Sequence, residues 1–246
     1  MSIEKKLEKR FEEYRTSAVR NVNKPRLPII MVLDKSGSMA DHGGIPMQNL
    51  LKSVNRFKQD VCMDPKAAEC IDIAILAFDE EVYLVQDWCC IEDMTPVNIT
   101  AEGGTDIAKG MNAAINMLRH KTREYDQAGI QSLVPHVILV TDGEDDGVDH
   151  VAKLIKKRES EGKMRMFTLA APNYDKETIA TLTQGERVLE LTDPSGYDFS
   201  EFFDFMAISV KAVSTSAPGE RVRINHNIGR PGSSCRVPNL DKWLNA

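Results

Sequence analysis

The chain has 246 residues, which is enough for one α/β domain of about 200 residues with extensions. Charged residues make up 28% and hydrophobic residues 42%, so the composition is that of an ordinary globular protein and not of a disordered chain. A formal net charge of -6 argues against a nucleic-acid-binding protein, because phosphate binding needs a basic face.

The first segment of the chain is highly charged and carries sparse apolar residues at helical spacing: Ile3, Leu7, Phe11 and Tyr14. This spacing predicts an amphipathic helix over residues 1–24, with one narrow apolar stripe. Such a helix either packs on its own domain or is presented to a partner, and the pattern does not distinguish the two. The segment has no apolar core of the kind found in secretion signals, and no stretch of the chain reaches the roughly 18 apolar residues of a membrane span.

Apolar runs suited to strands alternate with helical patterns through the middle of the chain. The predicted strands are 29–33, 71–78, 81–85, 137–140, 164–170 and 187–191. The predicted helices start at Pro46 or cover 106–125, 151–155, 175–184 and 198–213. Asp79-Glu80 is typical of a tight turn, so 71–78 and 81–85 should form a hairpin. The alternation predicts a single α/β domain over residues 25–213, with a doubly wound, mostly parallel sheet and one antiparallel edge strand.

The helical pattern stops at Ser214, and residues 214–246 form a basic tail. Its composition, with prolines, glycines and arginines against few acids, predicts a segment that is flexible in isolation. Within it, Trp243-Leu244 could dock on the domain or on a partner. The cysteines, an odd number without C-x-x-C spacing, argue against a disulfide framework and for a reducing cytoplasm; they are Cys62, Cys70, Cys89, Cys90 and Cys235.

Three short segments with small oxygen-bearing side chains follow or border apolar runs: residues 34–38 (DKSGS), 103–105 (GGT) and 141–143 (TDG). The carboxyl ends of the strands in a doubly wound sheet lie at one edge, where ligands bind, so these segments should meet there. The glycines are expected to supply backbone freedom, Gly37 in the first segment and Gly103-Gly104 in the second. The predicted metal ligands are Asp34, Ser36, Ser38, Thr105 and Asp142.

Carboxylate and hydroxyl oxygens suit a hard divalent cation, so Mg²⁺ is expected, with Mn²⁺ or Ca²⁺ as alternatives. Neutral hydroxyls withdraw less of the metal's charge than carboxylates, so the ion would stay electrophilic towards an Asp or Glu of another molecule. Nearby acids such as Asp41, Asp106 and Asp145 are either solvated rim residues or additional charge that would weaken this pull.

In type, order and approximate spacing, the five predicted ligands resemble the metal-ion-dependent adhesion site of the von Willebrand factor A family, with its pattern D-x-S-x-S, T, D. The resemblance covers residue 26 to about residue 213. It implies a doubly wound sheet with an antiparallel edge strand, a bound Mg²⁺ or similar ion, and an open coordination position for a partner's carboxylate.

Two shorter strings, at 26–28 and 202–216, are similar to the bacterial TerY-like branch of that family. This narrower resemblance implies a cytoplasmic protein of tellurium resistance or stress response. It also implies partners such as a PP2C-type phosphatase or a protein kinase.

A non-enzymatic protein-interaction domain is therefore the expected function, and two alternatives stay open. One is a metal-dependent phosphohydrolase with Asp34 as nucleophile, although such sites commonly carry a second acid where this chain has Ser36. The other keeps the metal only as a structural clip, with partners on the N-terminal helix or the tail. A calcium loop from Asp142 is excluded, because Lys153 stands where the bidentate Glu is needed, and the glycine signatures of dinucleotide and P-loop sites are absent.

Overall fold

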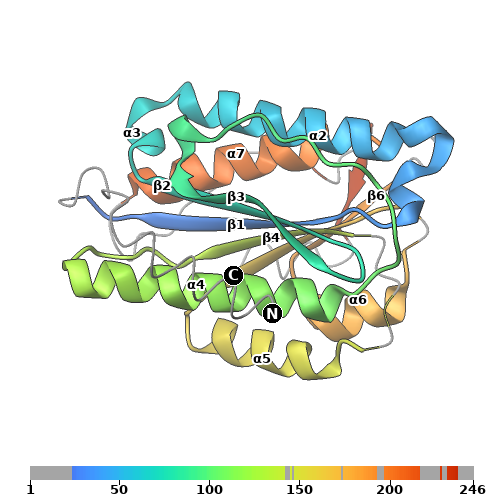
Figure 1. Ribbon diagram of the computed structural model, residues 1–246. Coiled ribbons are helices and arrows are strands. Elements are labelled where there is room, and N and C mark those ends of the chain that lie inside the picture. Colours follow the sequence, from blue (N-terminus) through green and yellow to red (C-terminus); the bar gives the residue numbers. More distant parts are fainter. Residues whose placement is uncertain are drawn as a thin grey trace.

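One twisted sheet with helices on both faces carries the predicted site (Figure 1). The computed structural model describes residues 24–141, 145, 147–172, 174–192, 197–216, 228 and 232–237. Within these residues the strand order is β3-β2-β1-β4-β5-β6-β7. The strands are β1 (Leu27–Asp34), β2 (Ile71–Phe78), β3 (Val82–Cys90), β4 (His136–Thr141), β5 (Arg165–Ala170), β6 (Val188–Leu191) and β7 (Cys235–Arg236).

The five central strands are parallel, and an antiparallel strand closes each edge of the sheet. β3 pairs with β2 through the predicted hairpin, and β7 pairs with β6 at the far edge. The predicted fold class, a doubly wound and mostly parallel sheet with an antiparallel edge strand, is confirmed. The second antiparallel edge was not predicted.

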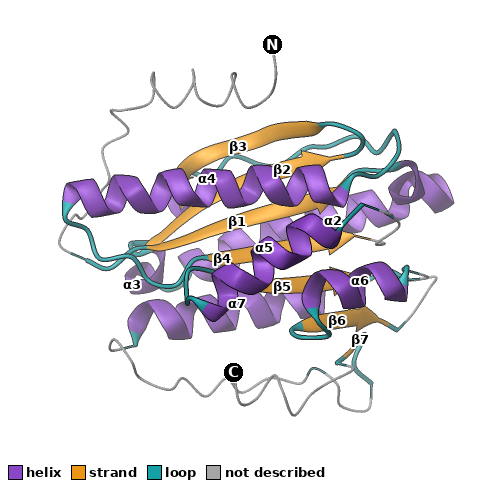
Figure 2. Cartoon of the chain, turned by 90° about the horizontal axis from the view of Figure 1, so that it is seen from below, coloured by secondary structure: helices purple, strands orange, loops and turns teal. Residues whose placement is uncertain are grey.

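The helices form two layers. α2 (Asp41–Cys62) and α7 (Ser200–Thr215) cover one face of the sheet, with the short α3 (Pro65–Ala68) at the end of α2 (Figure 1). Figure 2 looks onto the opposite face, which α4 (Ile107–Ala128), α5 (Asp149–Ser160) and α6 (Lys176–Thr183) cover. Short 3-10 turns, η1 (Gly37–Ala40) and η2 (Ile91–Asp93), follow β1 and β3.

The strand residues alternate between two hydrophobic cores. In β1, Met31 and Leu33 pack into the core under α2 and α7, whereas Ile30 and Val32 pack into the core under α4 and α5. All eight residues of β1 are buried, as are all eight of β2. This burial on both faces explains why the strands appear in the sequence as continuous apolar runs.

Part of the tail belongs to the folded domain. Cys235 is buried, and the Glu201 carboxylate at the start of α7 accepts hydrogen bonds from Ser234, at 2.7 Å from its backbone nitrogen and 2.9 Å from its hydroxyl. Residues 232–237 of the tail thus pack against the domain, whereas the flexibility of the tail in isolation stays a prediction. The predicted N-terminal helix, apart from Lys24, and Trp243-Leu244 lie outside the described residues. Among the helices that are described, none is long and apolar enough to cross a membrane.

Candidate metal site

The site is built at the carboxyl edge of the sheet, where β1 and β4 end side by side. Leu33 of β1 pairs with Val140 of β4, so the next residues, Asp34 and Thr141, are neighbours. Both are completely buried, and the Thr141 hydroxyl donates to Oδ2 of Asp34 at 2.6 Å. The backbone N–H of Ser36 donates to the other carboxylate oxygen at 2.9 Å. The Asp34 carboxylate is thus held at both oxygens in one orientation.

The loop after Asp34 places two serine hydroxyls together. Ser36 precedes the turn η1, and the backbone N–H of Met39 donates to its carbonyl at 3.0 Å, while the Met39 side chain is buried in the core. This turn brings Oγ of Ser36 and Oγ of Ser38 within 3.1 Å of each other. Ser36 is buried and Ser38 is exposed, so the pair leads from the carboxylate towards solvent.

The segment that carries Thr105 lies directly beside this loop. The backbone N–H of Gly37 donates to the Gly103 carbonyl at 2.9 Å, and that of Glu102 donates to the Lys35 carbonyl at 2.7 Å. Thr105 is half-buried, and its hydroxyl has no hydrogen-bond partner among the residues that the structure describes, which leaves its oxygen able to bind a cation. The structure thus brings Asp34, Ser36 and Ser38 together and places the segment that carries Thr105 beside their loop, while their role as metal ligands stays a prediction.

Of the glycines that were expected to supply backbone freedom, only some adopt a conformation that requires glycine. Gly103 has φ of +82°, a left-handed conformation, and a Cβ there would lie 3.0 Å from Cβ of Asp79. Gly37 does not adopt a left-handed conformation. The expectation that Gly37 supplies unusual backbone angles is therefore wrong, because the loop turns through an ordinary 3-10 conformation.

The third segment is anchored on both sides of Asp142, which itself lies outside the described residues together with Gly143. Thr141 bonds to Asp34 on one side. On the other, the Asp145 carboxylate accepts from the backbone N–H of Ala108 in α4 at 3.2 Å, and its carbonyl accepts from the Thr178 hydroxyl at 2.9 Å. The role of Asp142 as a ligand remains a prediction.

A buried ion pair that the sequence reasoning missed supports the first loop. Nζ of Lys35 lies 2.6 Å from Oδ2 of Asp79, and both side chains are almost fully buried. Burial disfavours both charges, but the mutual hydrogen bond and charge outweigh it, so the pKa of Lys35 is raised and that of Asp79 is lowered. The signal available in the sequence was a lysine inside the motif itself, between Asp34 and Ser36.

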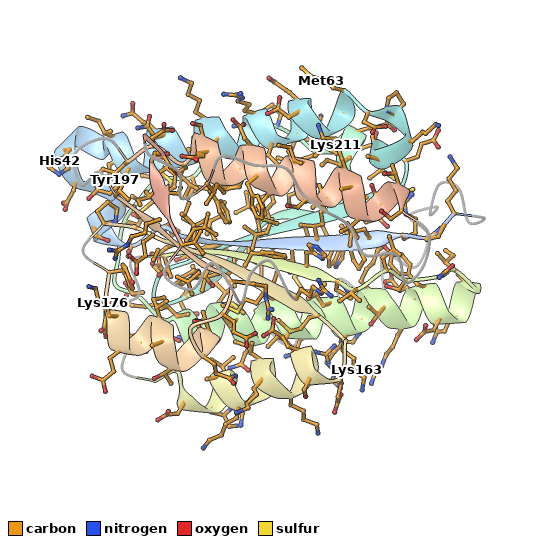
Figure 3. All side chains as sticks on the ribbon, turned by 180° about the vertical axis from the view of Figure 1, so that it is seen from behind. His42, Met63, Lys163, Lys176, Tyr197 and Lys211 are labelled. Carbon is orange, nitrogen blue, oxygen red and sulfur yellow. The ribbon has the colours of Figure 1, made fainter. Side chains whose placement is uncertain are left out.

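Aromatic side chains line the rim at this edge. The rings of His42, after η1, and Tyr197, before α7, have centroids 6.0 Å apart, and Figure 3 shows them at the same end of the molecule as Lys176 of α6. Lys163, which precedes β5, lies at the opposite end. The rim is therefore formed by loops that follow strands, as in other open α/β sheets.

The donor set fits a hard cation. Among the residues that the structure describes, no group of three or more His, Cys, Asp or Glu side chains could hold a metal ion. The oxygens that lie together there are the fixed Asp34 carboxylate and two serine hydroxyls, with the segment of Thr105 beside them. Mg²⁺, Mn²⁺ and Ca²⁺ prefer such oxygen ligands.

The fold and these loops define a class of open α/β domain with carboxylate and hydroxyl side chains at the carboxyl edge of its sheet. Within that class, residues 29–144 match the model of the von Willebrand factor type A domain, a range that includes all five predicted ligands. This part of the chain is thus similar to the von Willebrand factor type A domain. A search of curated protein sequences found no match.

Solved structures share the fold at low sequence identity. The pilus adhesin SpaC from Lactobacillus rhamnosus GG has a TM-score of 0.60 at 14% identity, over 77% of this chain and 31% of that one. The PilB minor pilin from Streptococcus sanguinis has a TM-score of 0.55 at 12% identity, over 76% and 62% of the two chains. Proximal thread matrix protein 1 from the mussel byssus, with a zinc-occupied MIDAS motif, has a TM-score of 0.51 at 20% identity, over 78% and 46%.

These identities show the fold alone. The chain spans about half the length of the mussel protein and less than two thirds of the two pilus proteins. What the complete proteins do is therefore not transferred to this chain as a finding.

Proposed function

We propose that this chain is a non-enzymatic protein-interaction module that binds an Asp or Glu of a partner protein through a divalent cation. The observation that carries the proposal is the buried Asp34 carboxylate, fixed by Thr141 at the end of β4, in a loop that also brings the hydroxyls of Ser36 and Ser38 together and lies beside the Thr105 segment. The adhesin SpaC and the mussel protein with an occupied MIDAS motif lend support by their shared fold.

The residues that would hold the ion are Asp34, Ser36, Ser38, Thr105 and Asp142. Mg²⁺ is the proposed ion, with Mn²⁺ or Ca²⁺ as substitutes. When bound, the ion supplies an electrophilic position for a carboxylate oxygen. The chain's own contribution is to orient Asp34 through Thr141 and to bring the neutral hydroxyls of Ser36 and Ser38 together, so that the ligands would neutralise the cation's charge only in part.

The observed hydrogen bonds disfavour the enzymatic alternative. Both oxygens of Asp34 accept hydrogen bonds, from Thr141 and from the backbone of Ser36, and these bonds fix the carboxylate in one orientation. Ser36 also stands two residues after Asp34, where enzymes with an aspartyl nucleophile commonly carry a second acid. These features suit an oriented ligand better than a phosphoryl acceptor.

The cellular setting is proposed on the sequence alone. The TerY-like strings suggest a cytoplasmic stress-response or tellurium-resistance complex with a PP2C-type phosphatase or a protein kinase. The comparisons do not support this narrower branch, so these partners remain hypotheses. The net charge argues against nucleic acid as the partner.

The metal is tested by calorimetric titration of the metal-stripped protein with Mg²⁺ and Mn²⁺. One saturable site, lost in Asp34→Ala and Asp142→Ala, is expected. Asp41→Ala is the matched control, because Asp41 is an exposed acid in the same region that is not among the proposed ligands. Equal loss in the control, or no binding by the wild type, would contradict the proposal.

The open position and the absence of turnover are tested on the same protein. With Mn²⁺ bound, acetate should displace a coordinated water and lower the water-proton relaxation rate. A chromogenic phosphate monoester should not be hydrolysed. Turnover that disappears in Asp34→Ala would instead establish the phosphohydrolase.

A further inference from the structure

The Lys35 side chain connects the elements on which the predicted ligands are carried. We propose that Lys35 is a positioning residue, which fixes the Thr105 segment against the Asp34 loop through its ion pair with Asp79 and thereby sets the affinity of the site for its cation. The inference rests on the proposed function. It adds a residue that is not among the ligands and that occupies a variable position of the D-x-S-x-S pattern.

The contacts of Lys35 reach three different segments. Its backbone N–H donates to the Phe78 carbonyl at the end of β2 at 2.9 Å, and its carbonyl accepts from Glu102 at 2.7 Å. Its ammonium group lies 2.6 Å from the Asp79 carboxylate and 3.3 Å from that of Glu102. It also lies 4.7 Å from the ring centroid of Tyr83 in β3, a cation–π distance. One residue therefore links the Asp34 loop to the hairpin and to the Thr105 segment.

Asp79 passes this link on to the start of α4. Its carbonyl accepts from the backbone N–H of Asp106 at 2.9 Å, the residue directly after Thr105. Its carboxylate also accepts from the backbone N–H of Glu81 at 2.7 Å, which holds the hairpin turn in place. The Gly103 backbone lies so close to Asp79 that a Cβ would lie 3.0 Å from the aspartate Cβ. Thr105 is thus bracketed by residues that pack against Asp79.

Position and charge make opposite predictions for the metal. As a mere positive charge, Lys35 would repel a cation, and removing it would strengthen metal binding. As a positioning residue, it would favour binding, and removing its link would weaken binding. Replacing a residue that orients metal ligands typically changes metal affinity by about 10-fold to 100-fold.

The test compares three variants of the full chain, with Mn²⁺ alone as the probe and calorimetry as the readout. Lys35→Met with Asp79→Asn removes one positive and one negative charge together, so the local net charge is unchanged. Lys109→Met removes a cation of the same region that contacts Glu81 and Asp106 at 3.5 Å but not Asp79. Lys35→Arg keeps both the charge and a donor for Asp79. Thermal unfolding without metal is measured in parallel.

The double variant should bind Mn²⁺ about 10-fold to 100-fold more weakly than the wild type. Lys109→Met should bind Mn²⁺ at least as tightly as the wild type. Lys35→Arg should bind Mn²⁺ more tightly than the double variant but more weakly than the wild type. A double variant that folds and binds like the wild type would overturn the inference and leave the proposed function intact. Failure of the wild type to bind Mn²⁺ would overturn both. If the double variant does not fold, Asp79→Asn alone breaks the same link, and unchanged affinity there would equally overturn the inference.

Discussion

Replacing Thr141 with valine removes one hydroxyl and nearly preserves the shape of the last residue of β4. That hydroxyl donates to the Asp34 carboxylate at 2.6 Å, and both residues are completely buried. A hydrogen bond to a charged group contributes about 1.5–3 kcal/mol, and a buried carboxylate cannot replace it with water. The free energy of unfolding of the metal-free variant should fall by that amount. Mn²⁺ affinity should fall by about 10-fold to 100-fold, because Asp34 loses its orientation.

The neighbouring strand offers a matched control. Thr168 of β5 is also completely buried, but its hydroxyl has no hydrogen-bond partner in the part of the chain that the structure describes. Thr168→Val therefore removes an unpaired polar group, whose burial costs about 1–3 kcal/mol. The same chemical change should leave stability unchanged or raise it by about 1 kcal/mol, and it should not alter Mn²⁺ affinity.

Urea denaturation followed by circular dichroism, in the presence of a chelator, measures the stability of both variants near neutral pH. Calorimetry with Mn²⁺ measures their affinity. Equal destabilisation by the two substitutions would refute the reasoning, because the effect would then come from the isostere and not from the bond to Asp34. Destabilisation of Thr141→Val without any loss of Mn²⁺ affinity would show that Asp34 is not a ligand.

Three further perturbations probe the loops, the opposite edge and the pH dependence. Gly103→Ala should lower the free energy of unfolding by about 1–3 kcal/mol in urea denaturation, because it combines a left-handed φ with a close contact on buried Asp79. Gly104→Ala should cost less, because its new methyl group meets the flexible Glu80 side chain. Equal losses of stability in the two variants would contradict this expectation. At the amino edge of the sheet, the Tyr125 hydroxyl donates to buried Asp72, which also pairs with Arg26. Tyr125→Phe should therefore lower the free energy of unfolding by about 1.5–3 kcal/mol and leave Mn²⁺ affinity unchanged. A change in Mn²⁺ affinity would contradict the separation of the two edges. Burial lowers the pKa of His136 from 6.5 to about 4. Between these two pH values the unfolded chain binds more protons than the folded chain, so the free energy of unfolding should fall as the pH drops, by about 3 kcal/mol at most. A denaturation series at several pH values in which His136→Gln keeps the full pH dependence of stability would refute the assignment.

The strands were predictable from the sequence because the sheet is covered on both faces. Runs such as 29–33 and 71–78 are apolar at every or nearly every position. Turn residues bound these runs so closely that they have the length of a strand and are too short for a typical helix. The continuation of β3 to Cys90 was not predicted, since its second half is only half-buried and includes Gln86 and Asp87. β7 was not predictable either, because two residues of strand depend on Glu201 and Glu190, which are distant in the sequence.

The same distinction holds at the site. The meeting of the Asp34 loop, the Thr105 segment and the end of β4 was predictable, because parallel topology brings strand ends to one edge. The supporting residues were not, since their roles depend on partners that only the folded chain defines. In the sequence, Lys35 cannot be distinguished from other loop lysines, and its role follows only from the folded structure, in which Asp79 lies 2.6 Å away. Asp145 is one of several acids in its loop, and only the folded structure shows that it accepts a hydrogen bond from the backbone N–H of Ala108.

These contacts bear on how strongly the site would attract a partner's carboxylate. Extra acids near a cation would neutralise it and weaken that attraction. Asp106 caps α4 by accepting the backbone N–H of Lys109 at 2.7 Å, Asp145 accepts that of Ala108, and Asp79 is paired with Lys35. Each of these acids accepts a hydrogen bond from a backbone donor or a cation of its own, which partly offsets its charge. Among the described residues, the proposed ligands comprise one carboxylate, that of Asp34, and the hydroxyls of Ser36, Ser38 and Thr105. A cation bound in that way would retain the positive charge that an incoming carboxylate requires.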